Sequence, residues 1–532
     1  MGIPDSRGMD RHGESHSPAG GAPGSPPDRT RGNSSGDRRL RRCFLLLVDG
    51  LRPDVAEGLL EAGRLPHLAA MVQGGGGVTR AVTSFPTTTS VSYLPFLTGC
   101  TPGGCNVPSI RWLDRTAYDG RWWRNRDAVR SYCGYQAGLL DSDIDPRVRT
   151  IFELVPESIA FFTMITRGLT PERDPARRAR VYWAAIGHYL FWNQPSDDVV
   201  ARHLLRAVDQ SWKFFFAQFP AVDGYTHQSS PEAPKVIRAL ERVDRVVGRL
   251  RAQLAARGEL EESLILVVSD HGATSVHTHL DLPEWFRRRG VPTLSHPIMW
   301  QRAPRAAVMV AGNGSAMVYA RLTEPRTARW SIERLRHPDA FGSHSDLIAE
   351  LVADPAVALV VGESEDGGLR VVSSSGEAEV RSGDDAMIAY RPMTGDPLEI
   401  GGARTLTHRE WLEQTWDTRF PDAPVQILDQ FRSSRTGDLV VVGREGFDFR
   451  RRYEIPEHKA GHGSMHRAHM QIPLWSSHPL PAERLRSADL FPSMLAWLGV
   501  TVPADIDGEL LWRPGRNRRA GSPVHRVAAA LP

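Results

Sequence analysis

Two unbroken apolar runs stand out along the chain: Cys43 to Val48, and Leu264 to Val268. Runs without polar alternation are typical of strands that are buried on both faces of a parallel sheet. Before the second run, apolar residues recur at helical spacing, at Val236, Leu240, Val243, Val247, Leu250 and Leu254. A helix followed by a buried strand predicts an α/β core with a doubly wound, mostly parallel sheet.

The pattern changes in the second half of the chain. Short apolar segments separated by Gly, Asp and Pro turns predict strands near 305–322, 356–361, 369–372 and 386–390. We therefore expect an inserted, smaller α+β cap over residues 291–455. The core would then consist of residues 43–290 and 456–515.

Three further segments have their own character. Residues 159–219 are helical in pattern and rich in aromatic side chains, most of which we expect to pack in the interior. Residues 485–500 read as an amphipathic helix. The first 37 residues are rich in Gly, Pro, Ser, Asp and Arg, which predicts a disordered tail over 1–42, and we expect a second, flexible tail over 516–532.

Composition narrows the class of protein. Of 532 residues, 41% are hydrophobic and 24% charged, and the net charge is only +3, so nothing favours nucleic-acid binding. No apolar segment reaches the roughly 20 residues of a membrane-spanning helix. Four cysteines without a CxxC pair favour a reducing compartment, although Cys100 and Cys105 would be able to pair in an exported protein. We expect a soluble, cytoplasmic protein.

Candidate metal ligands follow both predicted strands. Asp49 comes directly after the first run, and Ser269-Asp270-His271-Gly272 follows the second. These positions lie at the carboxyl edge, where open α/β sheets place ligands. Asp49 alone fits a turn as well as a metal site, but an adjacent carboxylate and imidazole favour a cation such as zinc.

Two weaker signals add histidines. Asp223 and His227 lie four residues apart, so both side chains are able to face one cation. His462 stands between Gly461 and Gly463, where the backbone is able to approach a ligand closely. Nearby histidines compete for the same role: His458, His466 and His469.

A hydroxyl cluster supplies a candidate nucleophile. Thr87, Thr88, Thr89 and Ser90 lead into an apolar segment that ends at Thr98-Gly99. A hydroxyl at the start of a helix has amide donors for a phosphate, and a coordinated metal makes it nucleophilic at neutral pH. By itself, such a run is more often a cap or a turn.

Taken in order, these motifs resemble the alkaline phosphatase superfamily, and most closely its type I phosphodiesterase/nucleotide pyrophosphatase branch. The resemblance covers roughly residues 43–290 and 457–511, including the closing motifs Ser487 to Pro492, Leu498-Gly499 and Asp507-Gly508.

The resemblance implies a ligand set and a nucleophile. One metal would be held by Asp223, His227 and His462, and a second by Asp49, Asp270 and His271. Thr89 would be the nucleophile bound to the second metal, because the family motif places it nine positions before the Thr of a Thr-Gly pair. His462 is preferred over its neighbours because the family pattern continues into a Pro-Leu strand, matched by Pro473-Leu474.

The chain departs from the family at the phosphate-binding asparagine. Pro108-Ser109-Ile110-Arg111 stands in its place, and Asn106 comes a few positions too early. We expect Arg111 to bind the substrate instead, because a guanidinium forms a charged, bidentate contact with phosphate.

The resemblance thus implies a phosphodiesterase that hydrolyses small phosphate esters through a phospho-threonine intermediate. The two divalent ions would be zinc, with manganese as the alternative. A phosphomonoesterase or a phosphonate hydrolase of the same superfamily remains an alternative. A sulfatase is disfavoured because no formylglycine precursor stands at position 89, and membrane-type transferases need spans that the sequence lacks. From another class, a non-catalytic metal-dependent module would bind phosphorylated ligands in the same cleft.

Overall fold

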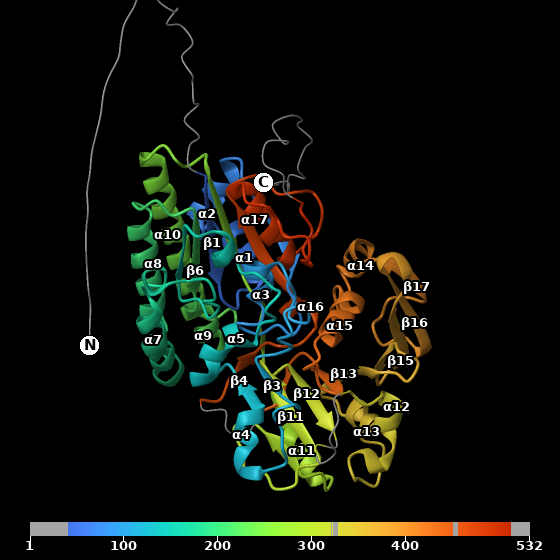
Figure 1. Ribbon diagram of the computed structural model, residues 1–532. Coiled ribbons are helices and arrows are strands. Elements are labelled where there is room, and N and C mark those ends of the chain that lie inside the picture. Colours follow the sequence, from blue (N-terminus) through green and yellow to red (C-terminus); the bar gives the residue numbers. More distant parts are fainter. Residues whose placement is uncertain (1–40, 321, 323–327, 451–455, 512–532) are drawn as a thin grey trace, which may run out of the picture. The chain divides into compact units, whose positions relative to one another are not determined.

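A computed structural model describes residues 41–320, 322, 328–450 and 456–511 of the chain (Figure 1). The two predicted tails lie outside these ranges, except for residues 41 and 42.

A seven-stranded sheet forms the core. Its strands run in the order β22 (Leu485–Arg486), β2 (Gly77–Val82), β21 (Gln471–Ser476), β7 (Ser263–Val268), β1 (Arg42–Val48), β6 (Phe214–Phe219) and β5 (Ser158–Phe161). The pairs β7–β1, β1–β6, β6–β5 and β2–β22 are parallel, and β21 is antiparallel to both of its neighbours. The predicted mostly parallel α/β core is confirmed.

Strand β1 is buried on both faces, which explains its unbroken apolar run. Phe44, Leu46 and Val48 pack with the helices α1 (Pro53–Glu61), α2 (Pro66–Gln73), α8 (Gln194–Ala207) and α10 (Pro234–Ala256). The alternating residues Cys43, Leu45 and Leu47 pack with α3 (Leu94–Thr98), α6 (Ile151–Leu154) and α17 (Leu490–Leu498). Figure 1 shows α8 and α10 side by side on one face and α17 on the other. Helices therefore cover both faces of the sheet.

The helical prediction for residues 159–219 is wrong at both of its ends. Residues 158–161 and 214–219 form the strands β5 and β6, and only α7 (Arg177–Leu190) and α8 between them are helices of more than one turn. Phe215 stacks on Phe44 of the neighbouring strand, with ring centroids 4.3 Å apart. A short apolar run fits a buried strand as well as a buried helix, and pairing with β1 decides for the strand.

The predicted helix at 485–500 is shorter than its pattern. β22 and one turn of 3₁₀ helix precede α17, which begins only at Leu490. The remaining elements that shape the core are α4 (Asn125–Ala128), α5 (Leu140–Asp143), α9 (Ala221–Gln228), α16 (Arg467–Met470), β3 (Arg111–Leu113), β4 (Val129–Ser131), β8 (Thr274–Ser275), β9 (Thr278–His279), β19 (Phe447–Asp448) and β20 (Ala460–Gly461).

A second, nine-stranded sheet lies within the region predicted as a cap. Its order is β10 (Thr293–Ser295), β11 (Ala306–Ala311), β12 (Ser315–Ala320), β18 (Leu439–Gly443), β13 (Val357–Glu363), β14 (Leu369–Ser373), β15 (Gly376–Ser382), β16 (Met387–Gly395) and β17 (Arg404–Thr407). All its pairs are antiparallel except β10–β11. The helices of the same region are α11 (Leu282–Arg288), α12 (Ile332–Arg336), α13 (Leu347–Ala353), α14 (His408–Thr415) and α15 (Ala423–Arg432).

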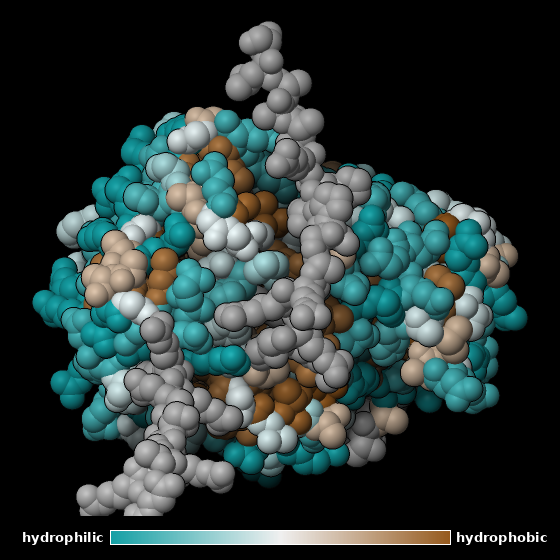
Figure 2. Space-filling model, turned by 90° about the horizontal axis from the view of Figure 1, so that it is seen from above, coloured by the Kyte–Doolittle hydropathy of each residue, from teal (hydrophilic) through white to brown (hydrophobic). Residues whose placement is uncertain are grey.

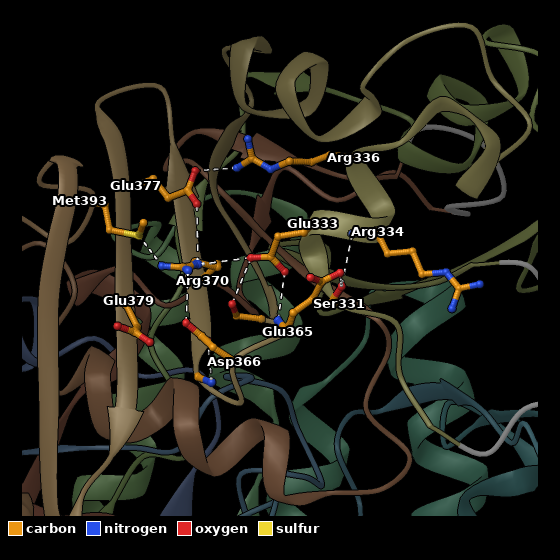
Figure 3. Close-up of polar contacts among 12 residues, drawn as sticks. Ser331, Glu333, Arg334, Arg336, Glu365, Asp366, Arg370, Glu377, Glu379 and Met393 are labelled. Atoms are coloured by element: carbon orange, nitrogen blue, oxygen red, sulfur yellow. Dashed lines mark hydrogen bonds and ion pairs between the residues drawn. The ribbon is translucent and has the colours of Figure 1, made fainter.

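A cluster of charged side chains joins α12 to this sheet (Figure 3). Arg370 on β14 lies 3.4 Å from Glu333, 3.5 Å from Asp366 and 3.9 Å from Glu377. Each carboxylate is partly exposed, so each pair contributes at most about 1 kcal/mol. We therefore assign this cluster a structural role.

Hydrophilic side chains predominate on the face that Figure 2 shows, with smaller hydrophobic areas between them. None of the helices in the described part of the chain is long and apolar enough to cross a membrane.

Candidate active site

The ends of three neighbouring strands bring the candidate ligands together. Asp49 follows β1, Asp270 and His271 follow β7, and β6 leads into α9, which carries Asp223 and His227. Since β1 lies between β7 and β6 and pairs in parallel with both, these side chains meet at one edge of the sheet.

Ligand atoms gather in two groups within this edge. Asp223, His227 and His462 offer atoms that all lie within 4.8 Å of one another, and so do Asp49, Asp223 and His271. The first group is the one that the family resemblance implies for one metal. The second contains Asp223 where the resemblance implies Asp270, although Oδ2 of Asp270 lies only 3.3 Å from Nε2 of His271. Asp223 is therefore common to both groups.

Gly50 allows Asp223 to approach Asp49. Its φ is +70°, and a Cβ placed on it would lie 2.6 Å from Oδ1 of Asp223. Any other residue would have to displace that carboxylate, so glycine after Asp49 has a direct structural reason.

The three histidines are oriented by backbone carbonyls. Nδ1–H of His462 donates to the carbonyl of Thr87 at 2.8 Å. Nδ1–H of His227 donates to the carbonyl of Ala460 at 2.8 Å, and Nδ1–H of His271 donates to the carbonyl of Gly272 at 3.2 Å. Because Nδ1 carries the proton in each neutral ring, the lone pair of the ring lies on Nε2. This is the tautomer of a metal-binding histidine whose other nitrogen is held by a backbone partner.

Burial and mutual repulsion perturb the carboxylates. Burial, together with the neighbouring charges of Asp270 and Asp223, raises the pKa of Asp49 well above its ordinary value. Burial and the charge of Asp223 raise the pKa of Asp270 to about 7. Burial opposes ionisation of Asp223 as well, but electrostatic attraction to His227, with smaller contributions from His462 and His271, holds its pKa below the ordinary value. Asp49 and Asp270 thus lack compensating positive charge.

The chemistry of these atoms fits divalent cations. Oδ1 of Asp223 and Oδ2 of Asp270 are buried and have no hydrogen-bond partner among the described residues. Buried carboxylate oxygens are normally satisfied, and here they face imidazole nitrogens that carry lone pairs. Cations bound among Asp, His and Thr oxygen and nitrogen atoms would satisfy both sets.

The three threonines have different surroundings. Thr87 donates to the carbonyl of Ser464 at 2.9 Å and accepts from the amide of Gly463 at 2.9 Å. Thr88 is fully buried. Thr89 is partly buried, and its Oγ1 lies 3.4 Å from Oδ1 of Asp49 and 3.2 Å from Nε2 of His271. Only the third hydroxyl in the run thus has contacts with the candidate ligands.

Arg111 lies on β3 and is buried. It donates to the carbonyl of Val310 at 3.0 Å and to Sγ of Cys133 at 3.3 Å. None of the hydrogen bonds described for Arg111 reaches a candidate ligand. Asn106, the nearest asparagine, accepts from the hydroxyl of Ser433 at 2.7 Å. The role of Arg111 in binding substrate stays a prediction.

Two of the competing histidines already have other contacts. His469 accepts from the amide of Ser464 through Nδ1 at 3.1 Å, so its Nε2–H donates to Thr274 at 2.9 Å. Both of its nitrogens are used. His458 stacks on His227 with ring centroids 4.0 Å apart, which makes it a support for that ring.

Sequence reasoning missed two residues that hold Asp49. Tyr93 donates to Oδ2 of Asp49 at 3.1 Å, and Gln218 donates to the same oxygen at 2.7 Å. Gln218 is the single polar residue in the buried strand β6, where an amide needs a partner. That isolated glutamine was the available signal.

The turn between β11 and β12 fixes His462. The amide of Gly314 donates to the carbonyl of His462 at 2.8 Å, and the amide of His462 donates to Gly312 at 3.2 Å. The second sheet therefore completes a site that the first sheet begins.

Comparisons with known proteins identify the family and the fold of the chain. Residues 43–366 match the family model for type I phosphodiesterase / nucleotide pyrophosphatase. Phosphonoacetate hydrolase from Sinorhizobium meliloti 1021, solved with phosphonoformate, is similar in structure with a TM-score of 0.52 and 15% identity, over 86% of this chain and 96% of that one. Human ectonucleotide pyrophosphatase / phosphodiesterase 5 is similar in structure with a TM-score of 0.52 and 13% identity, over 88% of this chain and 97% of that one. No curated protein matches the chain significantly.

Proposed function

The chain belongs to the type I phosphodiesterase / nucleotide pyrophosphatase family and is a metal-dependent phosphoric ester hydrolase; we propose that Thr89 is its nucleophile and that two divalent cations, zinc with manganese as the alternative, complete its site. The observation that carries this proposal is the position of the Thr89 hydroxyl between Asp49 and His271, beside two groups of ligand atoms that share Asp223.

In this proposal Asp223, His227 and His462 hold one cation, and Asp49, Asp270, His271 and Thr89 hold the other. The position of Asp223 in both groups suggests that it also contacts the second cation. When bound, the cations polarise the phosphoryl oxygens and lower the pKa of the threonine hydroxyl.

The nucleophilic step is assigned to Thr89. Its Oγ1 forms a bond to phosphorus as the bond to the leaving oxygen breaks, which gives a phospho-threonine intermediate. Oδ1 of Asp49 at 3.4 Å and Nε2 of His271 at 3.2 Å place this hydroxyl beside the ligand atoms of the second cation, and its proton passes through solvent to the leaving oxygen. Water then cleaves the phospho-threonine and releases the phosphate product.

Tyr93 and Gln218 are assigned a positioning role. Both donate to Oδ2 of Asp49 and leave Oδ1 turned toward Thr89. A carboxylate held in this way keeps a fixed orientation while the charge near it changes.

A comparison of bis(p-nitrophenyl) phosphate with p-nitrophenyl phosphate tests the proposal, with zinc or manganese added and with chelator. We expect faster cleavage of the diester and loss of activity with chelator. Thr89→Ala should lower kcat/KM by at least about 1,000-fold, whereas Thr394→Ala, at an exposed position on β16, should change nothing.

Other outcomes would redirect the proposal. Turnover of the monoester alone would make the enzyme a phosphatase, and turnover of a phosphonate alone would make it a phosphonate hydrolase. Tight metal binding without turnover of any ester would favour the non-catalytic binding module.

A further inference from the structure

Large apolar side chains are exposed together on α7 and the turn that joins it to α8. The exposed fractions are 68% for Val181, 61% for Tyr182, 68% for Leu190, 42% for Phe191 and 56% for Trp192. Single exposed apolar residues are common, but a run of this size marks an interaction surface. We call these five residues the α7 patch.

The half-buried ring of Trp183 links two rings of the patch. Tyr182 meets Trp183 edge to face with centroids 5.1 Å apart, and Trp183 meets Trp192 in the same way at 5.7 Å. Because these contacts link the helix to the turn that follows it, the patch is a preformed surface.

The charge around the patch is positive. The sequence from Pro175 to Ser196 contains no Asp or Glu. Arg177 and Arg178 are exposed in the first turn of α7, while Arg180 lies 3.8 Å from the buried Asp174. Exposed arginine beside exposed Trp, Tyr, Phe and Leu is the composition of helices that lie in a lipid interface.

A basic groove begins next to the patch. It lies between α8 and α10, has a volume of about 290 Å³ and starts at Gln194, two residues after Trp192. Its lining includes Arg242, Arg245 and Arg249, all of them exposed. Asp197 and Asp198 also line it, but Asp197 is buried, and Asp198 accepts a hydrogen bond from Gln194 at 3.1 Å. Positive charge therefore continues beyond the apolar side chains.

The patch is tied to the helix that carries two candidate ligands. The amide of Gln194 donates to the hydroxyl of Tyr225 at 3.1 Å, and Asn193 packs against Gly224 so closely that a Cβ there would lie 2.5 Å from its side chain. Both contacts fall between Asp223 and His227 on α9. Figure 1 shows α7 next to α9, and the two helices are in contact.

We propose that the α7 patch, with Arg177 and Arg178, docks this protein on an anionic lipid bilayer surface. Tyr and Trp side chains favour the headgroup region, where an apolar body and a polar tip are both satisfied. Exposed arginines add attraction to anionic headgroups. Docking in this way would place α9 and its ligands close to the lipid interface.

A second copy of the chain fits the patch less well. Most homodimer interfaces are two-fold symmetric and bring the same patch against itself. Arginines of one α7 would then meet the arginines or apolar residues of the other, without a carboxylate from the same segment to pair with them. Anionic lipid supplies the charge that a second α7 lacks.

Co-sedimentation with lipid vesicles tests the proposal without substrate, so its result does not depend on the hydrolytic function. We expect the full chain to bind vesicles of equimolar phosphatidylglycerol and phosphatidylcholine, and to bind pure phosphatidylcholine at least about tenfold more weakly. Leu190→Ser with Trp192→Ser should weaken binding at least about tenfold. Arg177→Gln with Arg178→Gln should weaken it about 25-fold, because each arginine near an anionic bilayer contributes about fivefold.

Trp300→Ser is the matched control, because Trp300 is 69% exposed and lies outside the patch. It should bind as the wild type does, and each variant should keep the wild-type melting temperature and its hydrolysis of a soluble nitrophenyl ester. Failure of the wild type to bind anionic vesicles would overturn the proposal, and so would binding that survives both double substitutions. Concentration-dependent self-association that disappears in the Leu190/Trp192 variant, without vesicle binding, would assign the patch to a second copy and also overturn it.

Discussion

Replacing Gly50 with alanine should disable the site through geometry alone. A Cβ at this position would lie 2.6 Å from Oδ1 of Asp223, about 0.8 Å short of an ordinary contact of 3.4 Å. Asp223 belongs to both groups of candidate ligands, so a displacement of this size changes both. Misplacement of reacting groups by about 1 Å costs on the order of 100-fold in rate. We therefore expect kcat/KM of Gly50→Ala to fall about 100-fold.

Gly63 provides a control for the backbone effect. Its φ is +68°, close to the +70° of Gly50, but a Cβ at Gly63 would meet nothing within 4 Å. Alanine in this left-handed conformation costs about 1–2 kcal/mol at either position. Gly63→Ala should therefore lower the melting temperature and leave kcat/KM unchanged.

The assay pairs calorimetry with steady-state hydrolysis of a nitrophenyl ester by both variants. Both melting temperatures should fall, that of Gly50→Ala by at least as much because its Cβ also meets Asp223, and only Gly50→Ala should lose activity. Retention of at least about one third of wild-type kcat/KM by Gly50→Ala would refute the reasoning, because it would mean that the position of Asp223 does not control the rate.

Further predictions concern the carboxylates. Gln218→Leu removes the amide that donates to Asp49 at 2.7 Å and should weaken cation binding about 10- to 100-fold. A metal titration would measure this effect. Unchanged affinity would show that Gln218 does not position Asp49. Asp223→Asn should lose both cations, whereas Asp270→Asn should keep the cation held by Asp223, His227 and His462. Metal analysis of the purified variants would measure this. Full loading of Asp223→Asn would contradict the shared role of Asp223. In metal-free protein the pKa of Asp270 is raised from 3.8 to about 7, so the folded state binds the extra proton, and stability should fall as pH rises through this window. Thermal unfolding with chelator between pH 4 and 7 tests this, and bound cation should remove or reverse the slope.

The core was predictable where one pattern had a single structural meaning. Unbroken runs gave β1 and β7, and the helical repeat before β7 gave α10. Residues 158–161 and 214–219 were not predictable in the same way, because short aromatic runs suit helices and strands alike. Pairing across β1, as between Phe44 and Phe215, settles that choice and is invisible in the local pattern.

The candidate site was predictable to the extent that it lies at strand ends. Asp49, Asp270 and His271 follow two strands that pair in parallel, so their proximity follows from topology. The sharing of Asp223 by two groups does not follow from sequence, because it depends on how closely α9 approaches Gly50. The contacts of Tyr93 and Gln218 with Asp49 do not follow from sequence either, because they join residues far apart in the chain.

His462 shows why the second sheet matters to a site built on the first. It comes directly after β20, far along the chain from Asp223 and His227, and β20 is only two residues long. Its position depends on the carbonyl of Thr87 and on the backbone of Gly312 and Gly314. Because β11 and β12 hold that turn, a change in the second sheet reaches the metal ligands through the backbone around His462. The turn between β11 and β12 is thus in direct contact with a candidate metal ligand, which places metal binding under the influence of the second sheet.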